Sequence, residues 1–371
     1  MFHKRQRVFP QLLPERAARH QISIVARHVS LIVQPGYTVR TTFLIQIAMS
    51  VPALFKNKLT APVIGAPMFL VSFPPLVTAL CKAGIVGTFP HVNARPAEQF
   101  DTWLTEIKRD LADYQATNPD AVIAPLGVNL IVHRTNPRFE PDLEIVVKHQ
   151  VPLVITCLGH PGKAIEAVHG YGGIVFCDVI SADHARKSMH AGVDGIICIG
   201  GGAGGHASTQ SSFSLVREIR EFWDGCLVLG GGINDGQQVR AAEMLGADFA
   251  YIGTRFIASK ESHAQEEYKQ MIVDCTIKDL IYTDRFSGVH ANFLLPSITR
   301  FGIDPATLPP KEPDVSGLAD TDAKAWKDIW SAGHGIATIH KVPTVAELAQ
   351  RIAREYREAC RVPISDAIAA V

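Results

Sequence analysis

The residues most suggestive of chemistry form a glycine-rich stretch that ends in a histidine. Residues 199–209 read IGGGAGGHAST, and five of the six residues before His206 are glycine. Three of these glycines satisfy the G-x-G-x-x-G pattern of dinucleotide-binding loops, while a phosphate-binding loop and a loop that positions the histidine are the alternatives. Because histidine exchanges protons near neutral pH, His206 is a candidate general base.

Two further glycine loops are candidates for binding phosphate. Residues 230–236 read GGGINDG and residues 253–255 read GTR, and each loop follows a short apolar run. Glycine lets an anion come close to backbone N–H groups. Each loop alone could be an ordinary tight turn, but the two together predict a flavin or sugar-phosphate site.

Polar residues and a methionine also stand at the ends of other apolar runs. Asn129 could bind a ring carbonyl or the backbone, and Asp178 could contact the site or cap the following helix. Met68 could pack on a planar ring or belong to the core. Thr156 lies near the end of a run of the same kind. We expect all four side chains on the same face of the protein as His206.

Eight short apolar runs, each followed by a turn and a helical segment, extend from Pro62 to Ile252. The runs are continuous rather than alternating, which is typical of parallel strands covered on both faces. Eight such units within about 190 residues predict an α/β fold of the (β/α)8 or TIM-barrel type, with an open doubly wound sheet as the alternative. The predicted strands are 62–65, 84–89, 125–131, 152–157, 173–177, 195–199, 226–229 and 249–252.

The order of these runs decides between the interpretations of the glycine-rich stretch. It follows the sixth run, and the polar residues 206–212 separate it from the next helical segment, whereas the last glycine of a dinucleotide fingerprint opens its helix directly. A P-loop would need Lys and Ser or Thr where His206 and Ala207 stand. The loops after predicted strands 7 and 8 are at the usual phosphate site of a barrel. We therefore expect the glycine-rich loop to pass close to a ligand and to aim His206 at a substrate.

The eight strand–helix units leave the two ends of the chain to be assigned to other parts of the protein. We expect the barrel to span residues 49–257, a mostly helical appended subdomain or lid to span 258–330, and a helix within 331–371 to pack back on the barrel. Residues 1–48 carry seven Lys or Arg and one acid. They could be a targeting peptide, a nucleic-acid arm or sequence upstream of a natural start at Met49. We expect a disordered extension or a mis-assigned start.

The composition argues against several classes of protein. Of 371 residues, 36 are Lys or Arg and 36 are Asp or Glu, which lacks the basic excess typical of nucleic-acid binding. No apolar run approaches the roughly 20 residues of a membrane-spanning helix. The seven cysteines are scattered and lack metal-ligand spacing. We expect a cytoplasmic enzyme without a metal site, which acts on a small molecule and could form a homo-oligomer.

Five segments, by their order and spacing, resemble the nitronate monooxygenase family, formerly called the 2-nitropropane dioxygenases. They are PVIGAPMFLVS at 62–72, VN at 128–129, AGGH at 203–206, GGI at 231–233 and IGTRF at 252–256. The resemblance extends from about Met49 to the C-terminus. It implies a TIM-barrel flavoprotein with non-covalently bound FMN, which oxidises alkyl nitronates with O2 to a carbonyl compound and nitrite.

The resemblance also implies roles for single residues. His206 matches the family's catalytic histidine, which would take the α-proton of a nitroalkane or stabilise the nitronate anion. The residues that would hold FMN fall into three groups: Ala66, Pro67, Met68 and Asn129 at the isoalloxazine ring, Gly231, Gly232, Gly253 and Thr254 at the phosphate, and Thr156, Asp178 and Gly205 elsewhere in the site.

Two residues depart from the family pattern. Ser208 stands where relatives often have glycine, and His334 lies in AGHGI at 332–336, a flavin-contacting segment that commonly reads Ala-Gly-Gln-Gly. The same superfamily contains NAD(P)H-dependent FMN reductases of quinones and enoyl thioesters, and such a reductase is the alternative function. A non-catalytic barrel that binds a phosphorylated ligand is the alternative from a different class.

Overall fold

The computed structural model describes residues 51–312 and 327–362. These residues belong to one compact unit. The expected N-terminal extension, residues 1–48, and the expected start at Met49 lie outside the described residues. All eight predicted strands lie within them.

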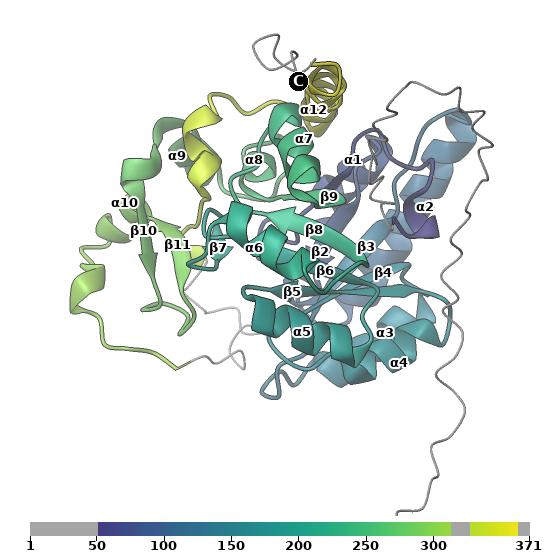
Figure 1. Ribbon diagram of the computed structural model, residues 1–371, viewed down its shortest axis with the longest axis horizontal. Helices are drawn as coiled ribbons and strands as arrows, with labels where there is room; N and C mark the ends of the chain where they lie inside the picture. The colour runs from purple at the N-terminus through teal and green to yellow at the C-terminus, as the bar shows by residue number, and fades with distance from the viewer. Residues whose placement is uncertain (1–50, 313–326, 363–371) are drawn as a thin grey trace, which may run out of the picture. The chain divides into compact units, whose positions relative to one another are not determined.

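Eight parallel strands form a barrel, which confirms the predicted fold class (Figure 1). The strands are β1 Val63–Gly65, β2 Gly87–Pro90, β3 Leu126–Ile131, β4 Leu153–Cys157, β5 Ile174–Val179, β6 Gly195–Ile199, β8 Cys226–Gly230 and β9 Phe249–Ile252. Their order is β1-β9-β8-β6-β5-β4-β3-β2, and a parallel bridge between Ile64 and Val86 links the two ends of this sheet. The ends of the strands differ from the predicted ones by at most three residues.

Helices connect the strands and cover the outside of the barrel. They are α1 Pro74–Lys82, α2 Gln99–Thr117, α3 Phe139–Lys148, α4 Gly162–His169, α5 Ala182–Ala191, α6 Ser212–Arg220 and α7 Gly236–Leu245. Two short 3-10 turns, η1 Ala53–Phe55 and η2 His91–Asn93, precede β1 and follow β2. Ser181 and Asp235 cap α5 and α7 by accepting hydrogen bonds from backbone N–H groups, and Gly246 ends α7 in the left-handed conformation.

The inside of the barrel is a packed apolar core rather than a channel, as in other barrels of this type. Alternate strand residues point inward, and among them Phe176 and Phe249 are fully buried. Phe55 of η1 packs on both rings, with centroid distances of 6.0 Å to Phe176 and 5.0 Å to Phe249. This plug closes the amino-terminal end of the strands and leaves their carboxyl end for ligands.

The region after β9 contains two strands that the sequence did not predict. It comprises α8 Thr254–Ile257, α9 Glu266–Asp274, η3 Ile277–Asp279, β10 Leu280–Thr283, β11 Ala291–Leu294, α10 Leu295–Thr299 and η4 Pro305–Thr307. β10 and β11 form an antiparallel sheet with β7, Gly205–His206, from the glycine-rich loop (Figure 1). β10 and β11 have four residues each, too few for an alternating pattern to stand out in a sequence. The appended region is therefore joined to the loop that carries the candidate base.

The predicted C-terminal helix is present as α12, Val345–Ala359, and follows the 3-10 helix η6, His334–Thr338. It packs against α7 and α1 (Figure 1). A Cβ on Gly236 of α7 would lie 2.1 Å from the backbone nitrogen of Tyr356, so this contact requires glycine. The boundaries expected for the appended subdomain and the C-terminal segment stay predictions.

The described ranges contain neither a membrane-spanning helix nor a disulfide. No helix in residues 51–312 or 327–362 is long and apolar enough to cross a membrane. All seven cysteines lie in these ranges, and none forms a disulfide. The expected cytoplasmic location and homo-oligomer stay predictions.

Candidate active site

A large cavity opens at the carboxyl end of the barrel strands. Its volume is about 720 Å³, within the usual range for cofactor and small-molecule sites. The structure brings eleven of the twelve predicted site residues into its wall: Ala66, Pro67, Met68, Asn129, Asp178, Gly205, His206, Gly231, Gly232, Gly253 and Thr254.

Thr156 is the predicted site residue that does not line the cavity. It is fully buried, and its hydroxyl donates a hydrogen bond to the carbonyl oxygen of Phe176 at 3.1 Å. Successive residues of a strand point to opposite faces, and the neighbouring Cys157 lines the cavity instead. The position of Thr156 therefore gives no support to its expected contact with a cofactor.

His206 lies in β7 and pairs across the sheet with Ala291 of β11. Its Nε2 atom lies 3.2 Å from the Oγ atom of Ser287, whose hydroxyl donates to the carbonyl oxygen of Val289 at 2.8 Å. Ser287 uses its only proton in the bond to Val289, so it must accept a hydrogen bond from Nε2 of His206. The proton of the neutral imidazole is therefore on Nε2, and the lone pair is on Nδ1. Burial lowers the pKa of His206 to about 4, and the imidazole is therefore neutral near pH 7.

The glycine-rich loop is held by close backbone contacts. Asn292 of β11 donates hydrogen bonds to the carbonyl oxygens of Gly201 and Ala203, at 3.0 and 2.7 Å. A Cβ on Gly204 would lie only 2.8 Å from the backbone nitrogen of Gly333. These glycines therefore serve close packing of the loop, which agrees with the interpretation that they position the histidine rather than bind a dinucleotide.

The loops after β8 and β9 form a glycine cradle, residues 231–232 and 253–254, at one side of the cavity. Gly231 and Gly232 have φ angles of +122° and +75°, which other residues rarely adopt. A Cβ on Gly232 would meet no atom of the described chain within 4 Å, so its backbone faces open space. Such a cradle lets a phosphate approach the backbone closely.

The segment that presents Met68 is fixed by Asn93, a site residue that sequence reasoning missed. The buried Asn93 of η2 donates through Nδ2 to the carbonyl oxygens of Met68 and Ser72, at 3.0 and 2.8 Å. Its Oδ1 accepts from the backbone nitrogen of Leu70 at 2.8 Å. Leu70 has a φ of +58°, and these three bonds hold the turn in which it lies. An amide side chain just after the second predicted strand was the available signal.

Two buried polar atoms face the cavity from the layer above the barrel core. Asp178 of β5 and Tyr251 of β9 stand two residues beyond inward-facing phenylalanines and therefore point to the same side of their strands. Among the described residues, neither Asp178 Oδ1 nor Tyr251 Oη has a hydrogen-bond partner. Burial raises the pKa of Asp178 to about 7 and that of Tyr251 well above its usual value. Buried polar atoms left unpaired by the protein indicate a polar ligand.

These features fit FMN, the cofactor that the resemblance implies. The glycine cradle suits a phosphate, and Asp178 and Tyr251 offer hydrogen bonds to polar groups elsewhere in the molecule. The two departures from the family pattern leave the wall intact. Ser208 is buried and accepts a hydrogen bond from the backbone of Gln210, while His334 is exposed and only its glycine neighbours line the cavity.

Comparisons with known proteins agree with this site. The family described as "Nitronate monooxygenase" matches residues 52–355. A nitronate monooxygenase from Paraburkholderia phytofirmans is 26% identical over 348 residues, which cover 80% of this chain and 92% of that protein. One from Neurospora crassa is 28% identical over 65% of this chain and 71% of that protein. With a probable nitronate monooxygenase from Staphylococcus haemolyticus, 27% identical, the match covers 52% of this chain and 60% of that relative.

Solved structures show the same fold. The nitroalkane oxidase from Streptomyces ansochromogenes has a TM-score of 0.69 and 24% identity, with 83% of this chain and 99% of that chain covered. FabK from Thermotoga maritima has a TM-score of 0.65 and 24% identity, with 82% and 95% covered. At these identities the likeness concerns the fold alone, whereas the family match spans most of the sequence. The chain belongs to the nitronate monooxygenase family of FMN-dependent oxidoreductases.

Proposed function

We propose that this protein oxidises alkyl nitronates with O2 to a carbonyl compound and nitrite. The observation that carries the proposal is the position of His206, which lines the cavity and whose Nε2 lies 3.2 Å from the hydroxyl of Ser287. Burial, which lowers its pKa, favours the neutral imidazole that a base requires. The glycine cradle, the unpaired polar atoms of the cavity and the family membership support it.

The chain offers a set of residues that would hold the cofactor. Residues 231–232 and 253–254 would bind the phosphate of FMN through their backbone, and residues 66–68 with Asn129 would lie along its ring. Asp178 would bind a polar group of the cofactor. When bound, FMN supplies the transfer of electrons from the substrate to oxygen. The protein contributes binding, orientation and proton transfer.

His206 would act on neutral nitroalkanes as a general base. Its Nδ1 would take the proton from the carbon atom next to the nitro group. A low pKa makes imidazole a weak base in the empty cavity, but the nitronate that forms is an anion and favours the imidazolium beside it. With a nitronate supplied as such, this step is unnecessary, and His206 would only stabilise the anion.

The electron donor separates this proposal from its alternative, an NAD(P)H-dependent reductase of quinones or enoyl thioesters. In anaerobic mixing of the holoenzyme, an alkyl nitronate should bleach the flavin absorbance rapidly, and NADH or NADPH should not. If NADH or NADPH bleaches the flavin and an alkyl nitronate does not, the proposal is wrong and the protein is a reductase. A purified protein without flavin absorbance would contradict both enzymes and favour a binding barrel.

The His206→Asn variant tests the base. It should keep its FMN but lose turnover of neutral nitroalkanes by roughly 10²–10⁴-fold, the usual contribution of a general base. His133→Asn is the matched control, because His133 bonds Thr135 and does not line the cavity. Full activity of the His206 variant with neutral nitroalkanes would overturn the assignment.

A further inference from the structure

One side of the cavity is an apolar cluster distinct from the barrel core. We term it the apolar wall; it consists of Phe69, Val92, Ile131, Cys157 and Leu158, all of which line the cavity. None of these side chains is charged, because burial raises the pKa of the Cys157 thiol and keeps it protonated. The wall therefore offers a neutral surface to whatever binds beside it.

The apolar wall stands across the barrel from the glycine cradle. Its residues belong to β3, β4 and the segments that follow β1, β2 and β4, whereas the cradle follows β8 and β9. In the ring of eight strands, β3 and β4 are opposite β8 and β9. A ligand anchored by its phosphate at the cradle thus has the apolar wall at its far side. His206 enters the same cavity from the segment after β6.

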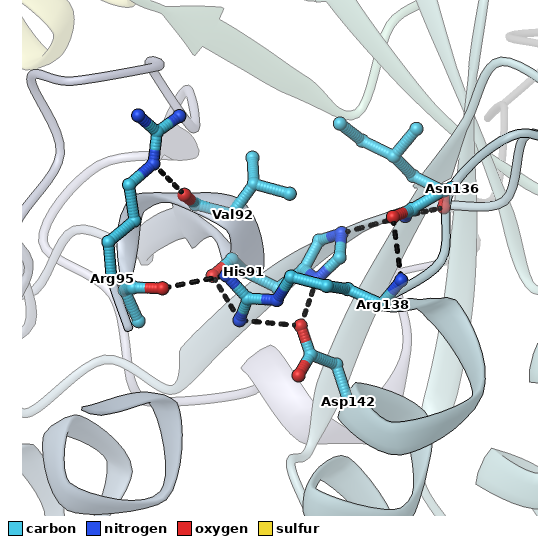
Figure 2. A network of polar contacts seen from close by, with 8 residues as sticks. His91, Val92, Arg95, Asn136, Arg138 and Asp142 are labelled. Atoms are coloured by element: carbon cyan, nitrogen blue, oxygen red, sulfur yellow. Dashed lines mark hydrogen bonds and ion pairs between the residues drawn. The ribbon is translucent and has the colours of Figure 1, made fainter. Parts of the chain in front are cut away.

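A buried ionic network lies beside Val92, one residue of the apolar wall (Figure 2). His91 of η2 and Asp142 of α3 are fully buried, and Nδ1 of His91 is hydrogen-bonded to Oδ2 of Asp142. Nη2 of Arg138 lies 2.8 Å from the same oxygen. Burial lowers the pKa of His91, and Arg138 therefore supplies the positive charge that balances the carboxylate.

Asn136 determines where the proton of His91 lies. Its Oδ1 accepts a hydrogen bond from the backbone nitrogen of Arg138 at 3.1 Å, which assigns the two ends of the amide. Its Nδ2 then donates to the carbonyl oxygen of Ile131 at 2.7 Å and to Nε2 of His91 at 3.3 Å (Figure 2). Because Nε2 accepts, the proton of the neutral imidazole is on Nδ1 and points to Asp142.

The network fixes the backbone on both sides of the apolar wall. On one side the carbonyl oxygen of Ile131 accepts the bond just described. On the other, Nη1 of Arg138 donates to the carbonyl oxygen of Ala94 at 2.7 Å, and Nε of Arg95 donates to that of Val92 at 3.0 Å (Figure 2). The segments that carry Val92 and Ile131 are thereby held relative to each other.

We propose that the apolar wall is the subsite for the hydrocarbon part of the substrate, and that His91, Asp142 and Arg138 are positioning residues that hold this wall in place. The proposal rests on the proposed oxidation of nitronates. The planar anionic end of a nitronate needs polar surroundings, whereas its alkyl chain gains from contact with neutral side chains. Each buried methylene should add about fourfold in affinity, equivalent to about 0.8 kcal/mol.

A homologous series of substrates tests the subsite. For the holoenzyme, kcat/KM should rise by about fourfold per methylene from ethyl to butyl nitronate. Val92→Ala should reduce this increment to roughly twofold, because part of the contact is lost. Val216→Ala, a truncation at a buried valine of α6 outside the cavity, should leave the increment unchanged. A wild-type rate independent of chain length, or equal effects of the two variants, would overturn the proposal.

Asp142→Asn tests the positioning role. It should raise KM for butyl nitronate by roughly tenfold and leave kcat for ethyl nitronate within about twofold, because the wall shifts while the reacting group stays in place. Asp248→Asn is the matched control, since Asp248 forms a similarly buried ion pair with Arg220 at 2.8 Å and does not line the cavity. Both variants should lower Tm. If Asp142→Asn and Asp248→Asn instead change kcat and KM to the same extent, the network has a purely structural role and the positioning role is overturned.

Linear carboxylates distinguish a failure of this inference from a failure of the proposed function. They share the planar two-oxygen anion of a nitronate, and their dissociation constants can be read from the change in flavin absorbance. Suppose that nitronates are not oxidised, but that the affinity for carboxylates still rises from propionate to hexanoate and falls in Val92→Ala. The subsite is then supported, and the proposed reaction is wrong. If nitronates are oxidised and neither series depends on chain length, the subsite is wrong. If Val92→Ala weakens the binding of FMN but leaves the chain-length dependence of both the nitronates and the carboxylates unchanged, the apolar wall contacts the cofactor instead.

Discussion

Nε2 of His206 and the hydroxyl of Ser287 lie 3.2 Å apart, although 81 positions separate the two residues in the sequence. The pairing of β7 with β11 brings the appended region to the glycine-rich loop and makes this contact possible. Because Ser287 already donates to Val289, it accepts from His206 and directs the basic nitrogen to Nδ1. The appended region thus takes part in setting the protonation pattern of the candidate base.

Ser287→Ala should impair proton abstraction more than oxidation. Without the serine, both tautomers of His206 become accessible, and we expect turnover of neutral nitroalkanes to fall by roughly tenfold, only a part of the roughly 10²–10⁴-fold that a general base contributes. Turnover of preformed nitronates should change little, because they need no proton removal. Ser259→Ala is a suitable control, as that buried hydroxyl bonds Phe256 outside the cavity. Equal losses with both kinds of substrate would contradict the tautomer argument.

The low pKa of His206 predicts how the protein responds to acid. The folded value of about 4 lies below the ordinary 6.5, so the unfolded chain takes up this proton at a higher pH than the folded one. The stability contributed by the neutral imidazole is fully present above pH 6.5 and is lost as the pH falls towards 4. Between these limits, Tm of the wild type should fall with acidification more steeply than Tm of His206→Asn. Parallel curves for the two proteins would be inconsistent with a buried neutral histidine.

Asp178 should make binding of FMN depend on pH. Its pKa of about 7 means that the carboxyl group is neutral at lower pH and adds a negative charge to the cavity at higher pH. Because FMN is itself an anion, its dissociation constant should increase as the pH rises through 7. Fluorescence titration of apoprotein with FMN measures this, and Asp178→Asn should abolish the dependence. The exposed Asp183→Asn should keep it, and a wild-type affinity that is constant across this range would refute the prediction.

Asn292 should be required for the conformation of the glycine-rich loop. Asn292→Asp is nearly isosteric but cannot donate to the carbonyl oxygens of Gly201 and Ala203 and places a negative charge beside them. We expect a lower Tm and a fall in kcat of roughly tenfold, since a small displacement of a catalytic group costs rate. Steady-state kinetics with a neutral nitroalkane and thermal melts measure both effects. Asn118→Asp loses a similar bond, from Nδ2 to the carbonyl oxygen of Tyr114 at the end of α2, but lies away from the cavity. This control should lower Tm and leave kcat unchanged.

The barrel and most of its cavity could be predicted from the sequence because both depend on local patterns. A strand buried on both faces must be a continuous apolar run, and eight such runs with intervening helices leave few arrangements. The carboxyl ends of parallel strands meet at one end of the barrel, so residues there, such as Asn129 and Asp178, share the cavity whatever the details of packing. Thr156 shows the limit of this argument, because a continuous apolar run does not reveal which residues face inward.

Only the tertiary structure decided the contacts that give these residues their chemistry. The pairing of β7 with β11 brings Ser287 to His206, and η2 supports Met68 through Asn93. The buried pair of His91 and Asp142 joins segments 51 positions apart. Each of these polar side chains looks like an ordinary loop or helix residue in the sequence, because hydrogen bonds between distant segments follow no local period. The proton position, the loop conformation and the neutral wall of the cavity therefore follow from the way the chain packs.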